Sequence, residues 1–290
     1  MGAWPPSAPC TPGACVEVSG SATAVPRAVL RLVAVVALLL AGIALLPVGG
    51  RVPAGLVRRW AGAVVRAAGV RPRFGGAAVP DGGLLLVANH ISWLDVPLLA
   101  MVRPARMIAK AEIRRWPVAG PLAARGGVLF IDRDRLRGLP DTVADIAGLL
   151  RSGAAVGVFP EGSTWCGRAQ GTFRRAVFQA ALDAGVPVQP VRIRYRLSGG
   201  APTTVPAFVG EDSLLASLWR VVMADGLVAE AEVRPALRPG AHADRRSLAR
   251  AAQRRTGPAP AGPGHAAPGA REAPECTVTS AVRSGGGPVG

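Results

Sequence analysis

The sequence contains little lysine, little acid and few aromatic residues. It has 34 basic residues against 18 acidic ones, and Lys110 is its single lysine, so nearly all of the positive charge is arginine. The net charge of +16 favours an anionic partner, which can be nucleic acid, an anionic bilayer or a phosphorylated substrate. Aromatic residues form 4% of the chain and no ladder of them accompanies the arginines, which argues against nucleic acid. A membrane surface is the better match.

Cysteine is also scarce. Cys10, Cys15 and Cys276 lie in terminal segments rich in Pro, Ala and Gly, and Cys166 has no Cys or His at metal-ligand spacing. The sequence therefore predicts neither a disulfide framework nor a metal site.

The composition separates the two ends of the chain from its middle. Residues 1–26 and 255–290 show no periodicity, and we expect both to be disordered tails. Residues 27–70 contain the uncharged apolar run Leu32–Val48, which predicts a membrane-anchoring helix, with a signal peptide or a hydrophobic hairpin as the alternative. After it, Leu56–Arg66 is amphipathic and bears arginines and a tryptophan. It predicts a helix that lies at the bilayer interface or packs on the domain that follows.

Residues 71–254 form the expected folded domain. Strand-like apolar runs alternate there with segments of helical periodicity, which predicts an α/β fold with a mostly parallel sheet flanked by helices. The expected strands are 84–88, 106–109, 127–132, 154–159, 186–196 and 228–233. The expected helices are 92–102, 112–125, 141–151, 171–184, 212–223 and a stretch after residue 243. Arg192, Arg194 and Arg196 share one face of their strand, as expected of a solvated edge strand or of a lipid-facing one.

The stretch Asn89–Asp95 carries the clearest chemistry. It follows the strand 84–88, so His90 lies where a strand passes into a helix, the edge at which open α/β sheets bind ligands. His90 and Asp95 are a little over one helical turn apart, so a bend at the helix start brings the carboxylate to the imidazole. A histidine held by an aspartate is a general base with a fixed tautomer, although a pair at this spacing also occurs in helix caps.

Three further blocks follow in order. Gly127–Arg133 is strand-like and ends in an arginine, Phe159–Ser163 follows an apolar run, and Val186–Val191 is again apolar. In this order and spacing the four blocks resemble the glycerolipid (lysophospholipid) acyltransferase family, whose best-known members are the 1-acylglycerol-3-phosphate acyltransferases. The resemblance covers residues 75–200, and the ordered set is specific where each block alone is not.

The resemblance implies an O-acyltransferase at the cell membrane, with its catalytic domain on the cytoplasmic side. In this family the His and Asp of the first block act as a charge-relay pair, which assigns catalysis to His90 and Asp95. The second and third blocks bind the acceptor head group, which assigns binding to Arg133, Glu161, Gly162 and Ser163. The expected partners are an acyl-CoA or acyl-carrier protein donor, a lysolipid acceptor and membrane lipids, without nucleic acid. Because a thioester is already activated, no metal, cofactor or covalent enzyme intermediate is expected.

One position departs from the family pattern. Many members that use lysophosphatidic acid have an arginine directly after the Ser or Thr of the third block, where this chain has Thr164. Arg168, Arg174 or Arg175 are candidates to replace it, but acyltransferases that complete ornithine lipids also lack this arginine. Lysophosphatidic acid, converted to phosphatidic acid, is the leading acceptor on the sequence alone, and lyso-ornithine lipid is the alternative.

Two other classes of function remain open. A lipid hydrolase would use Ser92, Ser163 or Cys166 as its nucleophile, but the Gly-x-Ser-x-Gly turn of serine hydrolases is missing. A membrane scaffold without activity would make the placement of the histidine and aspartate at a strand-helix junction a coincidence. Taken alone, Arg133 also fits a surface ion pair and Glu161 a turn carboxylate.

Overall fold

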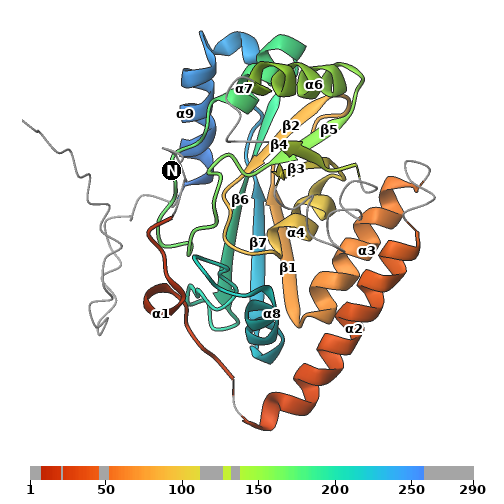
Figure 1. Cartoon of the computed structure of the whole chain (residues 1–290), viewed down its shortest axis with the longest axis vertical. Coiled ribbons are helices and arrows are strands. Elements are labelled where there is room, and N and C mark those ends of the chain that lie inside the picture. The colour runs from red at the N-terminus through yellow and green to blue at the C-terminus, as the bar shows by residue number, and fades with distance from the viewer. Residues whose placement is uncertain (1–7, 21, 46–51, 112–126, 132–137, 258–290) are drawn as a thin grey trace, which may run out of the picture.

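The structure, a computed structural model, describes residues 8–20, 22–45, 52–111, 127–131 and 138–257. At its centre lies a seven-stranded sheet with the order β1-β7-β6-β2-β5-β3-β4 (Figure 1). The strands are β1 (Val70–Gly76), β2 (Leu84–Ala88), β3 (Arg106–Lys110), β4 (Leu129–Ile131), β5 (Ala155–Val158), β6 (Val188–Leu197) and β7 (Leu227–Val233). The strands from β6 to β4 in this order run parallel, whereas β7 is antiparallel to β6 and parallel to β1. The expected fold class is confirmed.

Helices cover both faces of the sheet. On one face lie α6 (Leu139–Arg151), α7 (Ala176–Ala184) and α9 (Arg245–Thr256), and on the other lie α3 (Ala54–Ala67), α4 (Asp95–Val102) and α8 (Leu214–Met223) (Figure 1). Alternation along β2 explains the two layers, because Leu85 and Val87 pack with the first group of helices and Leu84 and Leu86 with the second. Each fully buried side chain of this size contributes about 1.5–3 kcal/mol, so this central strand is held from both sides.

The helix α2 (Val25–Ala44) pairs with α3 at one side of the domain (Figure 1). Trp60 Nε1 on α3 donates to the carbonyl of Leu38 at 2.8 Å, and Arg31 donates to two carbonyl oxygens at the end of α8. By length and composition α2 is apolar enough to cross a membrane, which agrees with the expected anchor. Its exposed large apolar side chains are Val25, Val29, Leu30, Val33, Val36, Leu39 and Leu40. α3 packs on the domain, against α4 and β1, as one of its two interpretations expected, and its position at a bilayer interface stays a prediction.

Residues 8–20, which we call the N-terminal segment, are ordered in this structure rather than part of a disordered tail. The one-turn helix α1 (Pro12–Cys15) is capped by Thr11, and Cys10 and Cys15 are buried in the core layer of α4 and α8. Glu17 Oε2 accepts hydrogen bonds from Thr203 Oγ1 (2.7 Å) and from the N–H of Thr204 (3.2 Å). Composition suggested disorder, but these long-range contacts hold the segment on the domain. Residues 1–7 and 258–290 lie outside the described ranges.

β6 lies inside the sheet, so the interpretation as an edge strand was wrong. Its neighbours are β7 and β2, and the arginines on its polar face meet acids from β7. Arg194 pairs with Glu230 at 3.3 Å and Arg196 with the same carboxylate at 3.2 Å, while Arg192 is largely buried. Arg194 and Arg196 thus pair with acids inside the sheet and Arg192 is buried, which argues against a lipid-facing role for this strand.

Several element boundaries differ from those predicted. The helix predicted at 171–184 begins at Ala176, because the backbone N–H groups before it bond outward, to the Gln253 side chain and to a carbonyl of the third block. The helix predicted at 92–102 begins at Asp95. β1 was not predicted, since a proline interrupts it, and Pro is tolerated there because β1 is an edge strand. The predicted helix at 112–125 lies outside the described residues.

Replacing Asp212 tests how the segment beside the site is held. Arg220 on α8 is nearly buried and donates to Asp212 at 2.6 Å and to two backbone carbonyl oxygens in residues 205–207. Asp212→Ala leaves this buried charge without its counter-ion, and we expect a loss of about 3–5 kcal/mol in the free energy of unfolding, measured by chemical denaturation. The matched control Asp225→Ala breaks an exposed ion pair and should cost less than about 1 kcal/mol. Equal losses in the two variants would contradict this assignment.

Candidate active site

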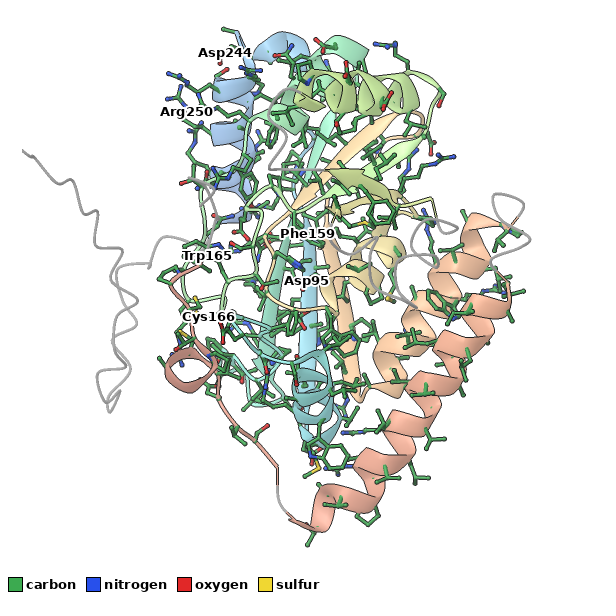
Figure 2. All side chains as sticks on the ribbon, in the orientation of Figure 1. Asp95, Phe159, Trp165, Cys166, Asp244 and Arg250 are labelled. Carbon is green, nitrogen blue, oxygen red and sulfur yellow. The ribbon has the colours of Figure 1, made fainter. Side chains whose placement is uncertain are left out.

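The candidate site lies at the edge of the sheet where β2 and β5 end. The two strands are parallel neighbours, so their carboxyl ends meet at the same edge. His90 follows β2, and Phe159 and Glu161 follow β5. Figure 2 marks Asp95, Phe159 and Trp165 in this region. The first and third sequence blocks thus come together at one edge of the sheet.

His90 and Asp95 form a hydrogen-bonded pair, with His90 Nδ1 2.8 Å from Asp95 Oδ2. The same oxygen accepts the backbone N–H groups of Ile91 (2.6 Å) and Ser92 (2.8 Å), because the chain bends sharply before α4 begins at the aspartate. The side chain of Asp95 is fully buried, whereas that of His90 is 21% exposed. Since Nδ1 is engaged by the carboxylate, Nε2 is the ring nitrogen that can meet a substrate. The predicted bend that brings the two side chains together is confirmed.

Two further residues build this site and were not predicted from the sequence. Asn89 accepts from the N–H of Ile193 (2.8 Å) and donates to its carbonyl (3.0 Å), which extends the pairing of β2 with β6 by one side chain. Two residues further along β6, Tyr195 donates its hydroxyl to Asp95 Oδ1 at 2.6 Å. Burial, followed by the nearby charge of Asp95, raises the pKa of Tyr195 well above its usual range, so the phenol remains a donor. Tyr195 is the single tyrosine of the chain, a signal that the sequence offered without showing its partner.

The third block shapes the surroundings of the imidazole. Phe159 stacks on His90, with ring centroids 3.9 Å apart and an interplanar angle of 9°. Glu161 Oε2 accepts the backbone N–H of His90 at 2.9 Å. Phe159 therefore fixes the ring plane and Glu161 the backbone. The predicted contact of Glu161 with an acceptor head group stays a prediction.

The chain turns immediately after Glu161. Gly162 adopts a φ of +80°, which favours glycine, and its N–H bonds the carbonyl three residues earlier at 3.2 Å. Ser163 is half-buried in this turn, and the N–H of Trp165 donates to the carbonyl of His90 at 2.8 Å. The third block is thus tied to the first on both sides of the turn. Arg133, the remaining predicted binding residue, lies outside the described residues.

Glu161 and Asp95 are carboxyl groups in different surroundings. Burial raises the pKa of Glu161 to about 8, and the charge of Asp95 adds to the rise, although the backbone N–H groups of His90 and Gly171 oppose it. Asp95 is instead surrounded by four donors, two of them backbone N–H groups. A carboxylate only accepts hydrogen bonds, so this arrangement suits the ionised form of Asp95. Paired with an ionised aspartate, the imidazole is oriented as a general base requires.

Comparison with known proteins agrees with this geometry. Residues 71–194 match the sequence profile of a family described as Acyltransferase. Over 202 residues, which cover 68% of this chain and 75% of the relative, the chain is 40% identical to a lyso-ornithine lipid O-acyltransferase of Pseudomonas aeruginosa. The chain belongs to the acyltransferase family. The resemblance drawn from the four sequence blocks is confirmed.

Two other comparisons describe this acyltransferase further. It is 38% identical over 140 residues to a 1-acyl-sn-glycerol-3-phosphate acyltransferase of Neisseria gonorrhoeae, which covers 48% of this chain and 54% of the relative. The crystal structure of the 1-acyl-sn-glycerophosphate acyltransferase PlsC from Thermotoga maritima has the same fold, with a TM-score of 0.55 and 19% identity. That match covers 70% of this acyltransferase and 76% of the other chain.

Glu161→Gln tests the buried carboxyl group of the acyltransferase. Because the pKa of Glu161 is raised in the folded state, folding favours the protonated form, and stability falls as the pH rises from about 4.5 to about 8. Glutamine cannot ionise but still accepts the His90 N–H, so the variant should lose this decline. We expect it to gain on the order of 1 kcal/mol or more over wild type at pH 8 relative to pH 5, measured by denaturation at both values. The exposed Glu211→Gln is the control, and an unchanged pH slope in Glu161→Gln would contradict the assignment.

Proposed function

We propose that this acyltransferase transfers a fatty acyl group from a thioester, acyl-CoA or acyl-carrier protein, to the free hydroxyl of a lysolipid. The observation that carries the proposal is the His90–Asp95 pair, with its 2.8 Å hydrogen bond on the Nδ1 side. The pair lies at the carboxyl ends of parallel strands, in a chain that belongs to the acyltransferase family. A serine or thiol hydrolase has less support, because Cys166 lies buried outside this pair of side chains and no Gly-x-Ser-x-Gly turn occurs.

The mechanism follows from the two ring nitrogens of His90. Nδ1 donates to Asp95, so the neutral ring carries its lone pair on Nε2, which takes the proton of the acceptor hydroxyl. The hydroxyl oxygen attacks the thioester carbonyl, and the new C–O bond forms as the carbonyl oxygen gains negative charge. When the tetrahedral intermediate collapses, the C–S bond breaks and the thiol leaves with the proton from the imidazolium. Asp95 stabilises the imidazolium between these steps.

For the acceptor, we propose lyso-ornithine lipid as the leading candidate and 1-acylglycerol-3-phosphate as the second. The relative named for the ornithine lipid matches 68% of this chain, whereas the relative named for the glycerophosphate matches 48%. Thr164 stands where an arginine is expected for a phosphate, and Arg168, a proposed replacement, pairs with Glu17 at 2.9 Å. A cation already paired with an acid is less suited to hold a phosphate. This ranking of the two acceptors reverses the one drawn from the sequence alone, because the ion pair of Arg168 with Glu17 could not be seen in the sequence.

The experiment measures acyl transfer in membranes that contain the protein, from labelled acyl-CoA to each of the two lysolipids in parallel. We expect transfer by wild type and a loss of about 10²–10⁴-fold in His90→Ala, the scale for a removed general base. His242→Ala is the matched control, because this histidine lies before α9, outside the site, and its loss should leave the rate unchanged. Product from the amino-acid lipid alone would support the proposed acceptor, and product from the glycerophosphate alone would reject it. Equal rates for wild type and His90→Ala would reject the mechanism.

We also propose that the protein is held at the cell membrane by α2, with the catalytic domain on the cytoplasmic side. Support comes from the exposed apolar surface of α2 and from the apolar residues at the start of α8, where Leu214 and Leu215 are exposed. Burial of a leucine is worth about 1.5–3 kcal/mol, so a row of them gives firm association with lipid.

A charge placed on the outer face of α2 tests this association. We expect the double variant Leu30→Arg, Leu40→Arg to lower the partition of the protein onto anionic vesicles by at least about tenfold, since two exposed leucines that would enter the lipid are replaced. Val18→Arg is the matched control, because Val18 is 87% exposed but lies in the N-terminal segment rather than on α2. Co-sedimentation with vesicles measures the partition. Equal partition of the double variant and wild type would contradict a role for this face.

A further inference from the structure

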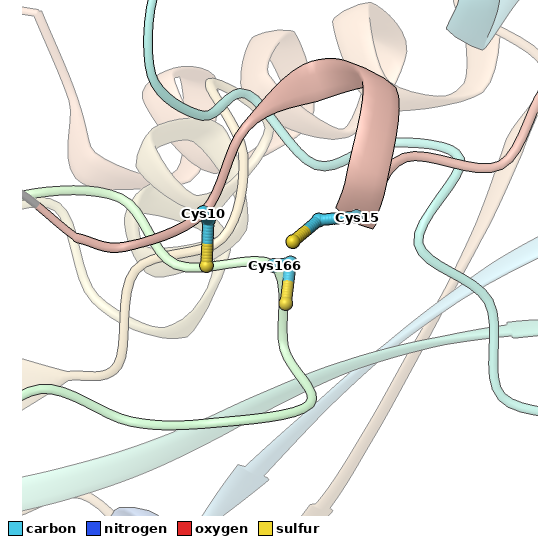
Figure 3. Close-up of side chains that lie close together, drawn as sticks. All are labelled: Cys10, Cys15 and Cys166. Atoms are coloured by element: carbon cyan, nitrogen blue, oxygen red, sulfur yellow. The ribbon is translucent and has the colours of Figure 1, made fainter. Parts of the chain in front are cut away.

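Three cysteines from two distant parts of the chain lie close together, beside the loop that follows the third block (Figure 3). Cys10 and Cys15 come from the N-terminal segment, and Cys166 from the loop that follows the third block. Their sulfur atoms all lie within 4.8 Å of one another, and the residues are 1%, 3% and 1% exposed. They were not connected in the sequence analysis, because residues 1–26 were expected to be disordered.

The spacing of the sulfurs fits a metal ion at their centre. In an equilateral triangle of sulfurs 4.8 Å apart, the centre lies about 2.8 Å from each, and a Zn–S bond of about 2.3 Å requires each sulfur to move inward by about 0.5 Å. Rotation about the Cα–Cβ bonds supplies a movement of this size without a change in backbone. An all-sulfur set favours soft ions such as Zn²⁺ over Mg²⁺ or Ca²⁺, which prefer oxygen.

The backbone around Cys166 is arranged for a thiolate. Gly167 adopts a φ of +89°, and the chain turns back so that the N–H groups of Arg168 and Ala169 donate to the Cys166 sulfur. Successive backbone N–H groups that point into one concavity form an anion-binding nest. A sulfur held as an anion is the form that binds metals.

The ligands are brought together by contacts other than the sulfurs. Glu17 holds the N-terminal segment on Thr203 and on the N–H of Thr204, and its second oxygen pairs with Arg168, two residues beyond Cys166. The two segments that carry the cysteines are therefore held side by side by an ion pair and by hydrogen bonds to the domain. A site whose ligands are held in advance loses less conformational entropy when an ion binds.

We propose that Cys10, Cys15 and Cys166 bind one thiophilic metal ion of the Zn²⁺ class. The thiols release their protons as the metal–sulfur bonds form. The ion joins the N-terminal segment to the loop in which Trp165 donates to the carbonyl of His90. Its role is structural, because it supports the loop behind the catalytic histidine.

The experiment uses the full chain in detergent micelles, reduced, freed of metal and then dialysed against Zn²⁺ or, in parallel, Mg²⁺. We expect one Zn²⁺ and no Mg²⁺ per chain by elemental analysis, with release of protons on binding. Each of Cys10→Ser, Cys15→Ser and Cys166→Ser should lose more than the roughly 10- to 100-fold in affinity that removal of an outer-shell partner costs. Cys276→Ser is the matched control, because it removes a cysteine that is not one of the three proposed ligands, and it should bind Zn²⁺ as wild type does.

A variant that fails to fold does not decide the question, so wild type is also melted with and without Zn²⁺. A higher melting temperature with Zn²⁺, absent in folded cluster variants, supports the site, because a ligand of the native state stabilises it. The proposal is overturned if reduced, folded wild type retains no Zn²⁺, or if folded Cys166→Ser retains as much as wild type. A disulfide within the cluster on oxidation, together with no Zn²⁺ binding under reduction, would also overturn it in favour of a redox pair.

Discussion

The buried carboxylate of Asp95 is the constraint on which the rest of the site depends. Taking an ionised carboxylate out of water is expensive unless hydrogen bonds replace the lost solvent. Four donors do so here: the imidazole of His90, the N–H groups of Ile91 and Ser92, and the hydroxyl of Tyr195. Three of them require the chain to bend between β2 and α4, and the fourth requires β6 to run on past the end of β2. The length of β6 and the sharp bend before α4 therefore serve the same purpose, which is to supply hydrogen-bond donors to the buried carboxylate of Asp95.

Glu161 complements Asp95 through the opposite environment. It accepts the His90 N–H, but burial raises its pKa to about 8, so around neutral pH it is largely protonated. The charge of Asp95 is then the single negative charge of the two, and its attraction for a His90 imidazolium is not shared with a second carboxylate. Two carboxyl groups in such different surroundings take different roles, here one electrostatic and one structural. In the sequence both residues stand after buried strands, and nothing in their spacing shows this difference.

The sequence allows two kinds of prediction: contacts between residues close along the chain, and contacts that follow from the order of parallel strands. The pairing of His90 with Asp95 needs only a local bend at the start of a helix, and the meeting of the first and third blocks needs only that β2 and β5 be parallel neighbours. The contact of Tyr195 with Asp95 spans 100 residues and depends on the register of β6, which no local pattern fixes. β6 looked like an edge strand because the acids that neutralise its arginines come from β7, later in the chain. The cysteine cluster was not predicted, because the composition of residues 1–26 suggests disorder. In the structure a few buried contacts hold residues 8–20 on the domain.

Part of the net positive charge is engaged inside the domain and part of it is exposed. Arg194 and Arg196 meet acids within the sheet, and Arg31 and Arg220 bind carbonyl oxygens or an acid inside the domain, so these cations are not available to a bilayer. By contrast, the arginines of α3 at positions 58, 59 and 66 are exposed, and α3 pairs with α2, whose outer face is apolar. Scattered over the surface, apolar side chains and exposed arginines would say little about a membrane. Here they lie on two adjoining helices, α2 and α3. That combination favours an anionic bilayer surface, because leucines enter the acyl boundary while arginines remain at the head groups. The membrane interpretation thus rests on the position of a few arginines rather than on the total charge.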